Sequence, residues 1–129
     1  MVMPDPLEGF SPGLYVAALA EVAHSDGLHA AELAILEEHA GRFGVDLDRL
    51  PALPSDLSDL PAATRVLVYR DAYMLAMADG EVSGLEGRRL EELAERLALT
   101  PANTESIRMW VHDYSALLGR FEELLRAVD

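Results

Sequence analysis

The sequence contains no cysteine, which excludes disulfide bonds, thiolate-bound metals and thiol redox chemistry. Aromatic residues are also scarce, at 6% of the chain, although half of the residues are hydrophobic. Leucine and alanine must therefore supply most of the core. Abundant leucine, alanine, glutamate and arginine favour helix over strand. A chain of 129 residues with this composition is expected to form a single domain.

Basic residues are few: 10 stand against 23 acidic residues, which gives a formal net charge of −13. Such a charge repels the phosphates of nucleic acids and anionic membrane surfaces, so we expect no nucleic-acid partner. It favours cations, or a protein partner with a basic or helical surface. Alternatively, the charge only keeps the protein soluble.

Long hydrophobic runs are absent as well. The uncharged stretch 9–20 has only 12 residues, too few to span a bilayer. The first five residues lack the basic region of a signal peptide. We therefore expect no direct membrane insertion and a cytoplasmic location.

The residue pattern predicts a series of helices. Ser11 and Pro12 mark the start of the first helix, which ends at the Asp-Gly pair 26–27. A second helix is expected over about 29–43 and ends at Gly44. Residues 46–61, rich in proline and aspartate, form a connector with short helical turns. The next helix, over 62–78, is apolar nearly all round, which is typical of a central helix.

The remaining chain predicts further helices. Ser83 and Glu86 form a capping box at the start of the next one. Thr100 and the following proline open the region 101–128, where apolar residues recur at alternating steps of four and three. Gly119 is a point at which this region could divide into two helices. We predict an all-α, compact bundle of about six to seven helices.

An internal repeat is the most informative signal. Segment 20–27 (AEVAHSDG) lies 53 positions before segment 73–80 (YMLAMADG), and 36–43 (LEEHAGRF) lies 54 positions before 90–97 (LEELAERL). Each copy predicts two helices joined by an Asp-Gly turn. The copies extend over about 14–45 and 62–99, and we expect them to pack about a pseudo-two-fold axis. Each second helix also carries a Glu four residues before an Arg, Glu38 with Arg42 and Glu92 with Arg96, which predicts surface ion pairs.

The two Asp-Gly turns carry the candidate chemistry. Segment 79–86 imitates the second half of an EF-hand loop, but Leu75 and Met77 occupy the first two ligand positions, so a true EF-hand is excluded. One interpretation is structural: the glycines make the turns, and Ser83 and Glu86 cap a helix. The other is functional. Carboxylates from both turns form an acidic patch that a calcium or magnesium ion would stabilise. The candidate metal ligands are Asp26, Glu32, Asp79 and Glu86.

Segment 78–86 (ADGEVSGLE) and segment 25–32 (SDGLHAAE), each followed by an amphipathic helix, resemble the paired motifs of TerB-like domains. These domains are named for bacterial tellurite-resistance proteins and also occur in DjlA-type co-chaperones. The resemblance covers about residues 14–99, and the first motif is one residue short. It implies a bundle of about seven helices whose two acidic turns are linked to a divalent-metal role.

The functional hypothesis is a non-enzymatic TerB-like interaction module in a bacterial stress-response or envelope-associated complex. The alternative is a calcium- or magnesium-binding or sensing domain. Tellurite is not a plausible substrate, because an anion faces a protein of charge −13 that has no thiol to reduce it. An enzyme would need two carboxylates that flank a cavity and differ in pKa. No cofactor other than a divalent cation is expected.

Histidines and aromatic residues leave two further alternatives. His24 and His29, with the nearby Asp26 and Glu32, have the residue types of a zinc-like site, but histidines that bind no metal are the preferred interpretation. Four residues of the last region form either an exposed groove-binding stripe or part of the core. Because other aromatic residues are few, we expect them to complete the core. They are Trp110, Tyr114, Leu117 and Phe121.

Overall fold

The computed structural model describes residues 10–24, 30–78 and 82–128. These residues form five α helices and one short 3-10 helix, and no strand occurs among them. The elements in chain order are α1 (Pro12–Ala23), α2 (Ala30–Phe43), η1 (Leu47–Arg49), α3 (Ala62–Ala76), α4 (Gly84–Arg96) and α5 (Pro101–Val128). The all-helical class predicted from the sequence is confirmed.

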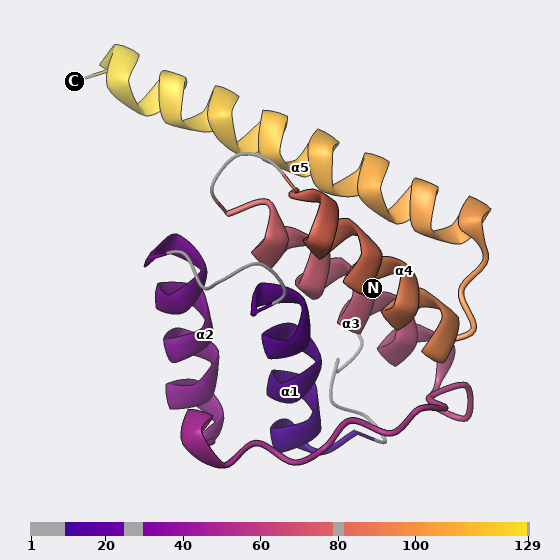
Figure 1. The fold of residues 1–129 in the computed structure, drawn as a ribbon. Coiled ribbons are helices and arrows are strands. Elements are labelled where there is room, and N and C mark those ends of the chain that lie inside the picture. Colours follow the sequence, from indigo (N-terminus) through magenta and orange to yellow (C-terminus); the bar gives the residue numbers. More distant parts are fainter. Residues whose placement is uncertain (1–9, 25–29, 79–81, 129) are drawn as a thin grey trace.

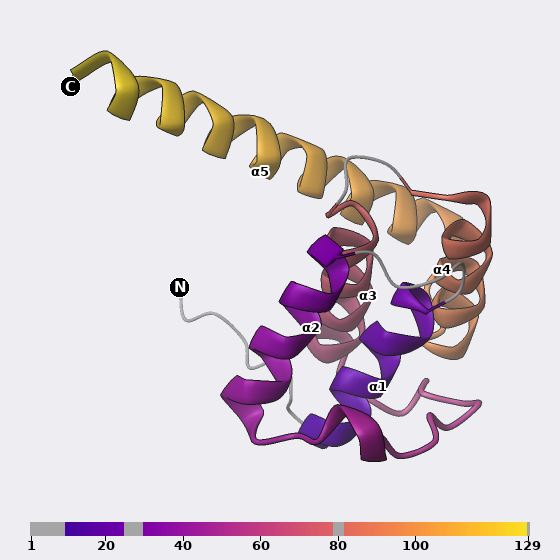
Figure 2. The ribbon, with the colours of Figure 1, turned by 60° about the vertical axis from the view of Figure 1, so that its left-hand side comes forward.

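Helices α1 to α4 pack side by side, and α5 runs across one end of this bundle (Figure 1). Helix α1 packs most extensively against α3, and α5 packs mainly against α3. After a turn of the view, the C-terminal half of α5 is seen to extend beyond the other helices (Figure 2). The fold is therefore a four-helix bundle with a long helix that projects from it.

Short-range signals set the helix ends. The Ser11 hydroxyl oxygen accepts a hydrogen bond from the backbone N–H of Leu14 at 3.1 Å, and Pro12 occupies the first helical position. Gly44 follows α2 with a φ of +66°, a left-handed conformation that glycine adopts without strain. The predicted N-terminal cap of α1 and the predicted end of α2 are both confirmed.

The described residues form five α helices, so the predicted count of six to seven is not confirmed. Gly119 does not divide the last region, because α5 continues without a break from Pro101 to Val128. The connector contributes only the three-residue η1. The two predicted hairpins correspond to α1 with α2 and α3 with α4, and a pseudo-two-fold axis between them stays a prediction.

Leucine, alanine and valine supply most of the core, as the composition predicts, and Tyr15 and Tyr69 are its largest fully buried side chains. The connector is tied to the end of α4. The backbone N–H of Leu57 donates to the carbonyl of Arg96 at 2.8 Å. The Arg65 guanidinium donates to the carbonyls of Leu60, at 3.1 Å, and Leu97, at 3.0 Å. One arginine thus satisfies carbonyls on both sides of this junction.

One of the two predicted surface pairs is confirmed. Arg42 and Glu38 lie 3.3 Å apart on α2. The prediction for α4 is wrong, because Arg96 instead pairs with Glu21 of α1 at 3.0 Å, while Glu92 pairs with Arg89 at 3.0 Å. A contact between two helices replaces the local pair. Within the described residues, none of the helices has the length and apolar character needed to cross a membrane.

Candidate functional site

The structure describes two of the four predicted metal ligands. Glu32 and Glu86 lie in the first turns of α2 and α4, at equivalent places in the two repeats, and are 0% and 1% exposed. Asp26 and Asp79, like His29, lie outside the described residues. Burial of both glutamates was not expected from the sequence, since such residues almost never lose all solvent contact.

Glu86 makes the predicted capping box. Its Oε1 atom accepts the backbone N–H of Ser83 at 3.1 Å, and the Ser83 hydroxyl oxygen accepts the backbone N–H of Glu86 at 3.1 Å. The other oxygen, Oε2, is buried and has no hydrogen-bond partner among the residues that the structure describes. In the same part of the chain, no group of three or more His, Asp or Glu side chains gathers in a way that would hold a metal ion. The structural interpretation of Ser83 and Glu86 is therefore confirmed, with one carboxylate oxygen left over.

The aromatic residues of the last helix do not complete the core, which corrects the expectation from the sequence. Trp110 and Tyr114 are 46% and 38% exposed, and Leu117 and Phe121 are each 56% exposed. The reason is geometric: only Thr104, Ile107 and Val111 of α5 are buried, because the bundle ends near Val111. From His112 to Val128 every residue is exposed except Gly119, which is half-buried.

The exposed residues of α5 form a continuous face. Large apolar side chains continue the line of the buried Ile107 and Val111 along one side of the projecting half, and we call them the apolar stripe. Their spacing of three, four and seven residues places them on one side of a helix. The stripe consists of Trp110, Tyr114, Leu117, Leu118, Phe121, Leu124, Leu125 and Val128.

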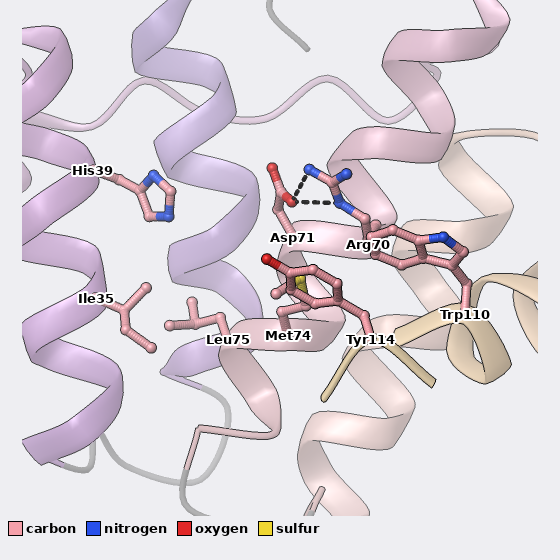
Figure 3. A pocket seen from close by; sticks show the side chains of 8 residues that line it. All are labelled: Ile35, His39, Arg70, Asp71, Met74, Leu75, Trp110 and Tyr114. Atoms are coloured by element: carbon pink, nitrogen blue, oxygen red, sulfur yellow. Dashed lines mark hydrogen bonds and ion pairs between the residues drawn. The ribbon is translucent and has the colours of Figure 1, made fainter. Parts of the chain in front are cut away.

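A groove begins where the stripe leaves the bundle (Figure 3). Its volume is about 430 Å³, and side chains from three helices line it. Ile35 and His39 come from α2, and Trp110 and Tyr114 come from α5 (Figure 3). The α3 side chains of the lining are Arg70, Asp71, Met74 and Leu75. Most of this lining is apolar, so the groove fits a hydrophobic side chain better than a charged ligand.

A chain of polar contacts runs from Tyr15 of α1 to two residues of the groove lining, Asp71 and Arg70. The Tyr15 hydroxyl donates to Asp71 Oδ2 at 2.5 Å, and the Arg70 guanidinium donates to Asp71 Oδ1 at 2.9 Å. Arg70 also lies 5.5 Å from the centre of the Trp110 ring, a cation–π contact. Burial, and then the Asp71 carboxylate, raise the pKa of the Tyr15 phenol far above its usual value. These contacts connect α1, α3 and the start of the apolar stripe.

Two further contacts fix α5 on α3. The Tyr73 hydroxyl and His112 Nε2 lie 2.8 Å apart, and the Arg108 guanidinium donates to the Tyr69 hydroxyl at 3.2 Å. Burial raises the pKa of the Tyr69 phenol, and the neighbouring Arg108 opposes that rise. His112, which stands alone in the sequence, thus helps to set the direction in which α5 leaves the bundle.

Sequence reasoning missed the polar chain of Tyr15, Arg70 and Asp71. One signal could have found it: Arg70 and Asp71 are adjacent charges between the apolar runs 66–68 and 72–78, where unpaired charges would be costly. The partner on α1 could not have been identified, because Tyr15 lies 56 positions earlier in the chain.

Comparison of the chain with models of protein families, with curated proteins and with solved structures finds no match.

Proposed function

We propose that this chain is a non-enzymatic protein-interaction module of the TerB-like kind, acting in a bacterial stress-response or envelope-associated complex, and that α5 is its binding element. The observation that carries the proposal is the apolar stripe. Eight large hydrophobic side chains on one helix face stand exposed to water. Contiguous apolar patches of this kind typically mark surfaces that bind another macromolecule.

Helix stability supports the same proposal. Isolated helices shorter than about 15 residues are marginal in water, and most helices in proteins are stabilised by the packing of an apolar face. Beyond His112 and Tyr114, which still contact the bundle, every residue of α5 up to Val128 is exposed or half-buried. A partner that covers the stripe would supply the missing packing, in the way that a groove holds an amphipathic helix.

Affinity capture from an extract of the natural host, quantified by mass spectrometry, tests this function. The bait is the wild-type chain, and the test variant combines Leu118→Glu with Leu125→Glu on the stripe. The control is Met109→Glu, which adds one negative charge on the side of α5 opposite Leu118, at a residue that is 60% exposed. We expect specific captured proteins, including the chain itself, to be lost from the double variant and kept by the control. Equal capture by all three baits would refute the proposal.

Divalent-cation binding is the second candidate function, and the buried Oε2 of Glu86 favours it. A buried carboxylate oxygen without a hydrogen bond costs free energy, and a hard cation at the turn would offset that cost. Oxygen ligands suit calcium or magnesium. The ligands in this proposal stay Asp26, Glu32, Asp79 and Glu86.

Thermal melts with EDTA, calcium or magnesium test the second candidate. A cation present at 100 times its dissociation constant should stabilise the wild-type protein by about 2.7 kcal/mol. Glu86→Gln keeps the side-chain shape and should lose most of this gain, whereas the exposed Glu91→Gln should keep it. If calcium and magnesium leave the wild-type melting temperature where EDTA leaves it, the metal function is wrong.

A further inference from the structure

The size of the apolar stripe limits what can cover it. Its eight side chains are on average about half exposed, and a large apolar side chain offers about 200 Å² of surface, so the stripe exposes roughly 800 Å². The largest apolar patch on a typical monomer is only about 300–600 Å². A stable protein–protein interface buries about 800 Å² on each partner. The stripe alone therefore matches one side of a full interface.

The spacing of the stripe fits a second helix of the same kind. From Tyr114, the steps through Leu118, Phe121, Leu125 and Val128 alternate between four and three residues, and they continue the period of the buried Ile107 and Val111. This alternation is the heptad pattern of helices that pack side by side. Trp110, Leu117 and Leu124, seven residues apart, widen the seam on one side. The face is thus complementary to a copy of itself.

Local charge favours the same occupant over a basic partner. Residues 112–128 carry three acidic and two basic side chains, a net charge of −1, whereas the whole chain carries −13. A strongly basic partner would be attracted to the acidic bundle and not to this nearly neutral helix. A second α5 meets no such mismatch on the projecting half.

The positions of two charged residues favour an antiparallel over a parallel arrangement of the two α5 helices. Asp113 and Arg120 are exposed and lie seven residues apart along the same edge of the stripe. In an antiparallel pair centred between Ala116 and Leu117, Asp113 of each copy faces Arg120 of the other. This arrangement also keeps the two acidic bundles at opposite ends, where their repulsion is smallest. A parallel pair would place both bundles at the same end.

The groove at the base of α5 completes the fit. In this register Phe121 of the second copy lies level with His112, within one helical turn of both Trp110 and Tyr114, beside the opening that Ile35, His39 and Met74 line. A phenylalanine side chain is apolar, as is most of the lining, and it would bury Trp110 and Tyr114 from above. The groove would then be filled by Phe121, which is exposed on the stripe of the second copy.

We propose, on the premise that α5 is the binding element, that the partner is a second copy of this chain and that two α5 helices pair antiparallel through their apolar stripes. The projecting halves overlap, and each ends against the base of the other helix. The interface is isologous, as in most homodimers, because the same stripe is used on both copies.

Light scattering coupled to size exclusion, at micromolar concentration, tests the assembly with purified protein. We expect the wild-type chain and Met109→Glu to show twice the 14.1 kDa mass of one chain. Leu118→Glu with Leu125→Glu should show the mass of one chain while keeping the circular dichroism of a folded bundle, because both residues are already exposed in the single chain. A wild-type mass of one chain, or a double variant that stays dimeric, overturns the proposal.

Single cysteines test the direction, since the chain contains none of its own. Oxidation should link Leu117→Cys dimers, because residue 117 lies next to the two-fold axis. Leu124→Cys should stay unlinked: its two copies would be about 15 helical positions apart, roughly 22 Å, far beyond disulfide range. A parallel pair would place the two copies of each residue on opposite sides of the seam and leave both variants unlinked, which would overturn the antiparallel arrangement.

Exchange of charges gives an independent check. Asp113→Arg should weaken the dimer by about tenfold, and the addition of Arg120→Asp should restore it, because the pair then attracts with opposite polarity. If the purified chain is monomeric but the extract yields other proteins whose capture needs the stripe, the dimer is refuted and the interaction module stands. If neither occurs, both proposals fail.

Discussion

Tyr15 is the residue at which burial and charge act together most strongly. Its hydroxyl donates to Asp71, and both burial and that carboxylate hold the phenol in its neutral form by raising its pKa. In the unfolded chain a tyrosine loses its proton near pH 10. Above that pH the unfolded state binds fewer protons than the folded state, so the free energy of unfolding falls; below it, the contribution is fully present.

We therefore expect the melting temperature of the wild-type protein to fall between about pH 10 and pH 12, and to fall less steeply in Tyr15→Phe. Tyr69, whose pKa is also raised, should keep part of the slope in the variant. At neutral pH, Tyr15→Phe should cost about 1–3 kcal/mol, because Asp71 loses a buried donor. Circular dichroism melts across this range measure both effects. The control is Tyr114→Phe, at an exposed tyrosine. If the melting temperature of Tyr15→Phe falls with pH as steeply as that of Tyr114→Phe, the explanation is wrong.

At the scale of elements, Gly119 is the weak point of α5. It lies within the helix, and a Cβ atom added there would meet no atom within 4 Å apart from its chain neighbours and the nearby backbone of the helix itself. Glycine in a helix interior is about 1 kcal/mol less favourable than alanine. Gly119→Ala should therefore slow hydrogen exchange of the amides around residues 116–126 by about fivefold. Gly41→Ala, at a helical glycine of α2 with equally open surroundings, is the control and should leave these amides unchanged.

The same elements show what the sequence can predict. Caps and turns are local, so Ser11, Gly44 and the box of Ser83 with Glu86 could be located from a few neighbouring residues. Neighbouring residues could not predict that the aromatic side chains of α5 are exposed. The spacing of apolar residues identifies which face of a helix is apolar. Whether the bundle covers that face depends on where α3 ends.

For the candidate sites too, local features could be predicted from the sequence and features that depend on packing could not. The repeat placed Glu32 and Glu86 at equivalent positions, yet their complete burial depends on how neighbouring helices close over the first turns of α2 and α4. The groove was not predicted, because its lining combines α2, α3 and α5, which lie far apart along the chain. The sequence pattern was enough to select the candidate residues. Their burial and their neighbours depend on how the helices pack, which the pattern does not give.

At the scale of the whole molecule, the net charge of −13 sets the response to salt. Two acidic chains repel each other, and salt screens this repulsion over a Debye length of about 10 Å at 0.1 M. We expect dimerisation to become tighter as ionic strength rises from low values, measured as the dissociation constant from sedimentation equilibrium. Binding of a basic partner to the acidic bundle would weaken over the same range, so the sign of the salt effect separates the two modes of association.

The length of α5 has a consequence for the behaviour of the protein in solution. A helix of 28 residues is about 42 Å long, whereas a compact globule of this size has a radius of gyration of roughly 14 Å. In the proposed dimer, the paired α5 helices would form a rod of about this length with one bundle at each end, and such a particle tumbles and sediments like a dumbbell. Its frictional ratio should exceed that of a sphere of equal mass, and small-angle scattering should resolve two maxima in the distribution of interatomic distances.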